Sequence, residues 1–244
     1  MDRVIYTGMA AAKHLLHRQE TLANNLANAN TTGFRAELVA LRAVPLRGQE
    51  AGTRVATVET TLGVDFTPGP MIATGRDLDV AIQGAGWLAV QTPDGGEAYT
   101  RNGSLQVAAD GTLTLPNGLP VLGEGGPLVV PANASVTVAP DGTVSAKVDG
   151  QTAVNAVGRL KLVNPPTEEL VKGNDGLFRL RSGEAADADP NVRVAAGTLE
   201  GSNVNVVEAM VGMIAAARQF ELQMKLLEAA RDNEQKANTL IATG

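Results

Sequence analysis

The sequence has 244 residues, of which 44% are hydrophobic and only 3% aromatic, and its formal net charge is −6. A folded chain of this length forms one large domain or two small ones. The acidic balance argues against a broad nucleic-acid-binding surface, which needs clustered Lys and Arg. The absence of cysteine excludes disulfides, cysteine-ligated zinc and thiol nucleophiles.

The first residues raise the question of a secretory signal peptide. Residues 4–12 are weakly apolar and end in three alanines. The preceding residues 1–3 carry no net positive side-chain charge, and Tyr6, Thr7 and Gly8 dilute the apolar run. We therefore expect the start of a helix rather than a cleaved signal. No apolar run approaches the roughly 20 residues that span a bilayer.

Glycine and proline divide the chain into three parts. All 12 prolines lie between Pro45 and Pro190, and only Gly8, Gly212 and Gly244 lie outside the glycine-rich middle. Because both residue types break helices, the two ends can be helical while the middle cannot.

The N-terminal part has apolar residues at alternating three- and four-residue steps, which predict a helix over residues 2–28. The helix is expected to end in the turn-forming cluster of residues 28–33. The apolar positions are Ile5, Met9, Ala12, Leu16, Ala23 and Leu26.

The C-terminal part has an unbroken four-three pattern, which is typical of the seam of a coiled coil. Asn205 and Glu208 resemble a capping box, so we expect a helix from Val206 to about Ala242. We predict that the two terminal helices pair as a coiled coil and make the assembly interface. The predicted interface residues are Ile5, Met9, Leu16, Leu26, Asn28, Val206, Met210, Met213, Ala217, Phe220, Met224 and Leu227.

The middle of the chain predicts β-structure. Five Asp-Gly and two Asn-Gly pairs, which favour hairpin turns, alternate with short apolar runs such as residues 87–90 and 136–138. The expected fold is α+β, with long N- and C-terminal helices and a mainly-β central domain. Its parts are residues 1–33 and 203–244 as a helical domain, an extended connector at 34–72, and the β domain at 73–202.

Two motifs resemble ligand-binding sites, but the residues around them do not fit those sites. Gly84–Ala89 matches the G-x-G-x-x-A pattern of dinucleotide folds, but a turn at residues 92–96 stands where the required helix should be. Asp187–Asn191 opens like a calcium loop, yet Val192 and Thr198 occupy the positions that need Gly and Glu. We interpret both as structural.

Catalytic and metal-binding residues are scarce. His14, His17 and Glu20 share a helix face, but no third and fourth metal ligands follow nearby. Asp77 and Asp79 would share one face of a strand, and the sequence lacks the aromatic platforms of carbohydrate sites. We therefore expect no enzyme activity, no cofactor and no metal.

Four motifs in a fixed order resemble the axial rod and hook proteins of the bacterial flagellum. The residues that carry this resemblance are Ala23–Arg35, Thr74–Trp87, Ala98–Gly103 and Leu199–Asn205. The Arg76–Asp77 pair and Trp87–Leu88 are similar to a proximal-rod member of this family.

The resemblance implies a structural subunit of the flagellar basal body. Such a subunit is exported by the flagellar type III apparatus without a cleaved signal. It packs with copies of itself and with other rod subunits into a tube that transmits torque and encloses the export channel. The resemblance implies no nucleic acid and no membrane insertion. The alternatives are another axial member, such as the distal rod protein, or a secreted β-rich binding module.

Overall fold

The computed structural model describes residues 2–45, 55–150 and 152–242. The chain forms two compact units, which are treated separately below. The helical unit comprises residues 1–29, 36–65 and 204–244, and the β unit comprises residues 30–35 and 66–203.

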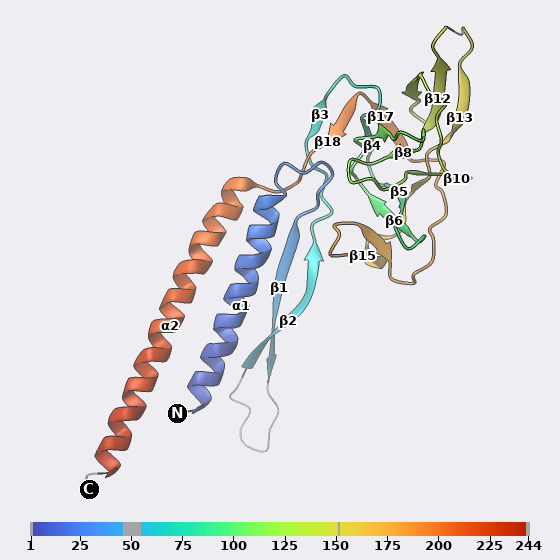
Figure 1. The fold of residues 1–244 in the computed structure, drawn as a ribbon. Helices are drawn as coiled ribbons and strands as arrows, with labels where there is room; N and C mark the ends of the chain where they lie inside the picture. Colours follow the sequence, from blue (N-terminus) through green and yellow to red (C-terminus); the bar gives the residue numbers. More distant parts are fainter. Residues whose placement is uncertain (1, 46–54, 151, 243–244) are drawn as a thin grey trace. The chain divides into compact units, whose positions relative to one another are not determined.

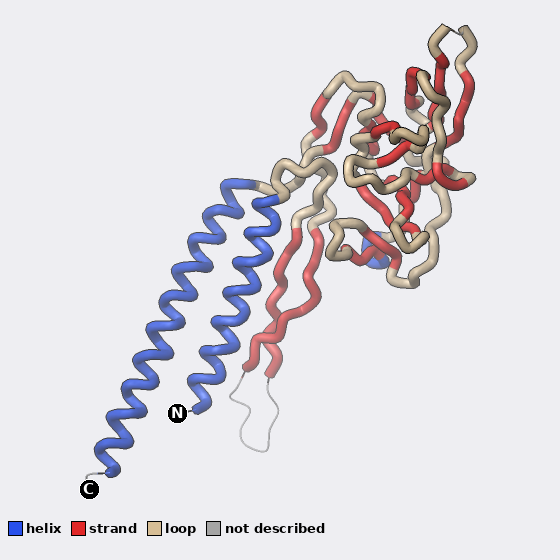
Figure 2. Tube along the Cα trace, viewed as in Figure 1, coloured by secondary structure: helices blue, strands red, loops and turns tan. Residues whose placement is uncertain are grey.

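The helical unit contains two long helices, α1 (Asp2–Ala27) and α2 (Val206–Ala242), which lie side by side and run antiparallel (Figures 1 and 2). The Asn205 side chain caps α2 as predicted, because its Oδ1 accepts hydrogen bonds from the amides of Val207 and Glu208 at 3.1 and 3.2 Å. Neither helix has a described stretch that is long and apolar enough to cross a bilayer.

The prediction that the terminal helices pair as a coiled coil was wrong. The predicted row on α2 contains Val206, Met210 and Met224, which are 38%, 48% and 42% exposed. Instead, the buried residues of α2 are the small Ala209 and Ala216. Small side chains let two helices approach closely, so the covered face is centred on these alanines and overlaps the predicted row only in part, at residues such as Leu227.

Besides α2, a pair of strands lies beside α1, which a coiled coil of two helices would not include. Strands β1 (Glu37–Pro45) and β2 (Val55–Val64) pair as a long antiparallel ribbon beside α1 (Figure 1). The sequence analysis expected an extended segment here, because residues 35–65 lack clear alternation, and it did not anticipate that the segment pairs with itself. The helical unit is therefore two helices plus a ribbon.

The side chain of Asn25 attaches this ribbon to α1. It is buried, its Oδ1 accepts from the amide of Glu37 at 2.8 Å, and its Nδ2 donates to the carbonyl of Glu37 at 2.8 Å. The amide group thus pairs with the start of β1 as a strand residue would. This contact gives a structural reason for one asparagine of the Ala23–Arg35 motif.

We expect Asn25→Ala to lower the free energy of unfolding by about 1–3 kcal/mol, since two hydrogen bonds are lost. Asn25→Asp keeps the acceptor, but it places a carboxylate oxygen against the carbonyl of Glu37 in a buried site, so its loss should be at least as large. Urea unfolding followed by far-ultraviolet circular dichroism measures both. Equal stability of Asn25→Ala and the unchanged protein would contradict this assignment.

The β unit contains short antiparallel strands and one 3₁₀ turn. The largest sheet has five strands in the order β14-β5-β6-β16-β15, and a three-stranded sheet has the order β11-β12-β13. The remaining strands pair as β4 with β17, β3 with β18, β7 with β8 and β9 with β10. The bounds are β3 Met71–Ala73, β4 Val80–Gln83, β5 Trp87–Gln91, β6 Glu97–Thr100, β7 Gln106–Val107, β8 Leu113–Thr114, β9 Leu122–Gly123, β10 Gly126–Pro127, β11 Ala134–Val138, β12 Thr143–Val148, β13 Asn155–Arg159, β14 Leu162–Val163, β15 Leu170–Lys172, β16 Phe178–Leu180, β17 Arg193–Ala196 and β18 Thr198–Glu200, with the 3₁₀ turn at Thr167–Glu169.

All five Asp-Gly pairs stand at turns between consecutive strands, as the sequence predicts. At Asp141 and Gly142, for example, the glycine has φ +86° and the aspartate Oδ1 accepts from the amide of Thr143 at 3.0 Å. The aspartate closes the turn and the glycine supplies a left-handed conformation that other residues adopt at a cost. Between these turns the alternating apolar residues form one core, which includes Val80, Leu88, Val90, Leu105, Leu113, Val121, Val144 and Leu160.

Tyr99 contributes a buried hydroxyl to this core. Its Oη accepts a hydrogen bond from the amide of Ala186 at 2.7 Å. Burial raises the pKa of Tyr99 to about 12, and the nearby Glu97 carboxylate adds to that rise. The folded state therefore favours the neutral phenol more strongly than the unfolded state does.

The raised pKa of Tyr99 predicts alkaline destabilisation. The stability that this group contributes is complete below pH 10.0, the ordinary value, and is lost as the pH rises through about 12. The loss is at most about 2–3 kcal/mol. Tyr99→Phe should not show this alkaline loss of stability. Its free energy of unfolding at neutral pH should instead be lower by about 1–3 kcal/mol, because the buried Ala186 amide loses its acceptor. Urea unfolding of both proteins across this pH range tests it; parallel pH profiles would contradict it.

Candidate assembly surface

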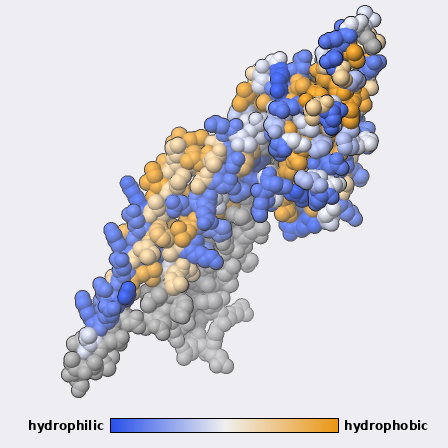
Figure 3. Space-filling model, viewed as in Figure 1, coloured by the Kyte–Doolittle hydropathy of each residue, from blue (hydrophilic) through white to orange (hydrophobic). Residues whose placement is uncertain are grey.

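The α2 helix carries an exposed apolar patch over its first turns, which we call the outer patch. It consists of Val207, Met210, Val211 and Ile214, whose exposed fractions are 70%, 48%, 61% and 57%. The spacing of three and four residues places these side chains on one face of the helix. Figure 3 shows apolar surface over this part of α2. Contiguous exposed apolar side chains of this kind mark interaction sites.

The opposite face of α2 lies against α1. A Cβ placed on Gly212 would lie 3.2 Å from the side chain of Leu22, and one on Gly8 would lie 2.6 Å from Leu227. These two glycines therefore allow close approach at both ends of the described helix pair. Since the α1-facing side is occupied within the chain, the outer patch is the apolar face that remains on the early turns of α2.

The twelve predicted interface residues fall into three groups. Five have more than a third of their surface exposed: Met9, Leu16, Val206, Met210 and Met224. Six are partly covered: Leu26, Asn28, Met213, Ala217, Phe220 and Leu227. The side chain of Ile5 lies outside the described residues. Of the predicted set, the structure places only Met210 in the outer patch.

Asn28 has a local role that its motif did not reveal. Its Nδ2 donates to the carbonyl and to the side-chain oxygen of Asn24, at 2.9 and 2.8 Å. It therefore participates in the end of α1.

The sequence analysis missed Val207, Val211 and Ile214. A signal was present, because these residues recur at steps of four and three, as the chosen row does. The longer row was the stronger pattern, but helical spacing alone does not show which of two apolar rows on one helix faces a partner.

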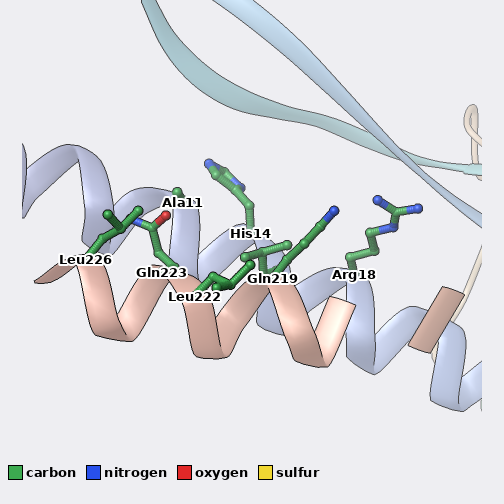
Figure 4. Close-up of a pocket in the computed structure, with 8 residues that line it drawn as sticks. Ala11, His14, Arg18, Gln219, Leu222, Gln223 and Leu226 are labelled. Carbon is green, nitrogen blue, oxygen red and sulfur yellow. The ribbon is translucent and has the colours of Figure 1, made fainter. Parts of the chain in front are cut away.

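A groove of about 390 Å³ runs between α1 and α2. In Figure 4, the side chains of His14 and Arg18 project from α1, and those of Leu222 and Gln223 rise from α2. The apolar part of its lining includes Leu15 and Leu226. The nearby His17 Nδ1 lies 3.1 Å from a carboxylate oxygen of Glu20, a pairing within α1.

The β unit contains a buried ionic cluster of Arg35, Arg101 and Glu200. Glu200 has no exposed surface, and Arg35 and Arg101 are 1% and 6% exposed. One carboxylate oxygen accepts from Arg35 Nη2 at 2.5 Å and the other from Arg101 Nη1 at 3.2 Å. Burial lowers the pKa of Arg101, an effect that Glu200 opposes and Arg35 reinforces. All three residues lie within the motifs Ala23–Arg35, Ala98–Gly103 and Leu199–Asn205, but their positions in the sequence do not indicate that they meet.

Aromatic side chains pack beside this cluster. The rings of Trp87 and Phe178 are 4.5 Å apart, and Phe66 meets Trp87 edge-on at 6.0 Å. The guanidinium of Arg101 lies 5.5 Å from the Trp87 ring centroid, within cation–π range. The cluster therefore has an apolar wall that keeps water from its charges.

The residues that resembled ligand sites have structural roles. Strand β5 follows Gly86 where a dinucleotide fold needs a helix. The carboxylate of Asp79 accepts from Thr74 Oγ1 at 2.7 Å and from Arg76 Nε at 3.0 Å, while Asp77 is exposed. Among the described residues, no group of three or more His, Asp or Glu side chains could hold a metal ion.

Comparison with protein families defines the class. Residues 5–35 match the model "Flagella basal body rod protein", residues 81–146 match "Flagellar hook protein FlgE/F/G D1 domain", and residues 195–240 match "Flagellar basal body rod FlgEFG protein C-terminal". The three matches are those of the axial rod and hook proteins of the flagellum. Each matched region contributes one member of the buried ionic cluster: Arg35, Arg101 or Glu200.

Whole-chain comparison identifies the member. The chain is 53% identical over 250 residues to the flagellar basal-body rod protein FlgF of Escherichia coli K12 and 50% identical to that of Salmonella typhimurium LT2, with 99% of each chain covered. It is 32% identical to the rod protein FlgG of Buchnera aphidicola from Acyrthosiphon pisum, over 90% of this chain and 92% of that one. The chain therefore belongs to the FlgF family of flagellar basal-body rod proteins. It is a structural subunit of the flagellar basal-body rod.

Proposed function

We propose that this rod subunit joins its neighbours through the outer patch of α2, residues Val207, Met210, Val211 and Ile214. The observation that carries the proposal is their exposure on a subunit whose relatives are rod proteins. The neighbours are copies of this chain and other proximal and distal rod subunits. Contacts that do not close on themselves build a helical assembly rather than a ring.

Each part of the chain has its own role in this assembly. The helical segments within residues 1–33 and 203–244 make the axial contacts, and residues 73–202 form the β body; residues 34–72, proposed from the sequence as a connector, supply the β1–β2 ribbon to the helical unit. In this arrangement the assembled helices transmit torque and enclose the export channel. The subunit performs no catalysis, which agrees with the structural engagement of its buried carboxylates, Asp79 and Glu200.

The N-terminal segment is retained in the assembled rod, and the flagellar type III apparatus exports the chain without cleaving a signal. Gly8 supports this, because it is buried against α2, where a Cβ on it would lie 2.6 Å from the end of the Leu227 side chain. Cleavage after the alanines at residues 10–12 would remove this helix contact.

Mass spectrometry of detergent-washed hook–basal bodies from the source organism tests the proposal. We expect a few copies of the chain per particle and recovery of the peptide that begins at Met1. Copies in the tens would move the subunit to the distal rod or hook. Absence of the chain, while other rod proteins are present, would overturn the assignment, and a mature N-terminus beyond residue 12 would overturn export without cleavage.

A further inference from the structure

The polypeptide passes between the two units at four places: after residues 29, 35, 65 and 203. In a rod subunit, any load between the units must pass through these four connections or through contacts between the units.

Within the β unit, Glu200 touches every segment that leads to a connection. Its carboxylate accepts from Arg35, the last residue before one connection, and from the amide of Gly69 at 3.0 Å, shortly after another. Its main-chain carbonyl accepts from the amide of Gly33 at 2.7 Å, in the loop between the first two connections. Glu200 itself ends β18, which leads into the fourth.

Arg101 holds the same carboxylate from the side of the core. Besides its bond to Glu200, it donates to the carbonyl of Ile82 at 3.2 Å and to that of Gly84 at 2.5 Å. These acceptors belong to β4 and to the turn that follows it. Glu200 is thus fixed to the sheet on one side and to the connecting segments on the other.

The connecting segments also lie against one another without room for side chains. A Cβ on Gly69 would lie 2.1 Å from the carbonyl oxygen of Gly201. Gly33 has φ +69°, and a Cβ there would lie 2.3 Å from the main chain of Arg101. The main chains of the connecting segments therefore lie directly against the main chain near Arg101 and Gly201, and the Glu200 carboxylate lies among them.

We infer that Glu200 is the residue that fastens all four connections to the β unit, and that its negative charge supplies the hold on Arg35 and Gly69. Bonds from an ionised group are roughly twice as strong as neutral ones. The fastening is a property of the isolated chain. Only its consequence, the passage of torque through these connections, rests on the proposed function.

Hydrogen exchange of the full-length chain tests the fastening. Glu200→Gln keeps the shape of the side chain and one acceptor oxygen but removes the charge. We expect exchange to accelerate by roughly tenfold or more at the amide of Gly69, which loses its charged acceptor, and at that of Gly33, whose segment is held less firmly once Arg35 loses its counter-charge. The amides of Val90 and Val121, in the core, should keep their rates.

Glu97→Gln is the matched control, because Glu97 forms a shielded ion pair with Lys161 at 2.7 Å in the same unit but touches no connection. It should leave Gly33 and Gly69 unchanged. If amide exchange in Glu200→Gln accelerated uniformly across the β unit, Glu200 would stabilise the whole unit and not the connections in particular, which would contradict the inference. No acceleration at Gly33 and Gly69 would overturn the inference outright.

Arg35→Gln keeps the inference testable if Glu200→Gln does not fold. It removes one contact and leaves Glu200 bound to Arg101 and Gly69. Exchange should then accelerate at Gly33 and not at Gly69; equal rates of change at both glycines would contradict the assigned arrangement. If these results hold while the chain is absent from hook–basal bodies, the fastening stands and the proposed function fails.

Discussion

Replacing Glu200 with methionine is expected to lower the free energy of unfolding by about 3–5 kcal/mol. The reason is that Arg35 and Arg101 would remain buried without their counter-charge. Taking a charged group out of water costs several kcal/mol, and a partner in good geometry offsets that cost. Since Arg35 is 1% exposed, water cannot take the place of the carboxylate without local opening.

The triple variant Arg35→Met, Arg101→Met, Glu200→Met distinguishes charge from packing. It removes all three charges together, so it should be less destabilised than Glu200→Met alone. Part of the loss should persist, because the carbonyls of Ile82 and Gly84 lose their donor. A triple variant less stable than the single variant would show that the contacts of the cations with carbonyls outweigh the ion pairs.

Urea unfolding followed by the fluorescence of Trp87 measures these effects. Trp87 is the one tryptophan of the chain and lies beside Arg101, so its emission reports on the β unit. Glu124→Gln is the surface control, because Glu124 is 51% exposed and pairs with Arg159 at 3.4 Å. Exposed pairs contribute about 0–1 kcal/mol. A loss of similar size in Glu200→Met would contradict the picture of a dry ionic cluster.

Ile214→Asp is expected to abolish incorporation of the subunit into the rod while the isolated chain stays folded. Ile214 is 57% exposed, so the aspartate is solvated in the free subunit. If the outer patch is buried on assembly, the charge must lose its water without a partner. An uncompensated buried charge costs about 3–5 kcal/mol, which weakens association by more than roughly a hundredfold.

Two variants control for this experiment. Ile214→Val preserves an apolar side chain at the same position and should assemble normally. Val154→Asp introduces the same charge at a residue that is 60% exposed in the β unit and should also assemble. Swimming in soft agar and mass spectrometry of hook–basal bodies, both in a strain without the native gene, provide the readouts. Normal motility of Ile214→Asp would exclude the outer patch from the interface.

Much of the fold could be predicted because its signals are local. The predicted helices over residues 2–28 and from Val206 to about Ala242 agree closely with α1 and α2. Asn205 caps α2 through bonds to residues two and three positions away. Each Asp-Gly turn is likewise closed within a few residues. Such interactions do not depend on the rest of the chain, so the sequence reveals them directly.

The ribbon β1–β2 and the candidate site were harder to predict. The ribbon pairs Glu37 with Val64 and Pro45 with Val55. The sequence between Pro45 and Val55 contains no Asn-Gly or Asp-Gly pair that would predict a hairpin. The outer patch depends on which face of α2 lies against α1, and α2 has two apolar rows that a helical period alone cannot rank. The choice was decided by Ala209, Gly212 and Ala216, whose small size permits close approach.

Local signals were sufficient to predict the helical ends, the β-rich middle with its turns, and membership of the rod and hook proteins through motifs in a fixed order. The covered face of α2 and the cluster of Arg35, Arg101 and Glu200 became evident only in the folded chain. Residues separated by 165 positions, as Arg35 and Glu200 are, share a hydrogen bond only after the intervening chain has folded. Helix caps and turns are stabilised by contacts between residues that are close in sequence. Burial of a charge or of a helix face depends instead on partners that distant segments supply.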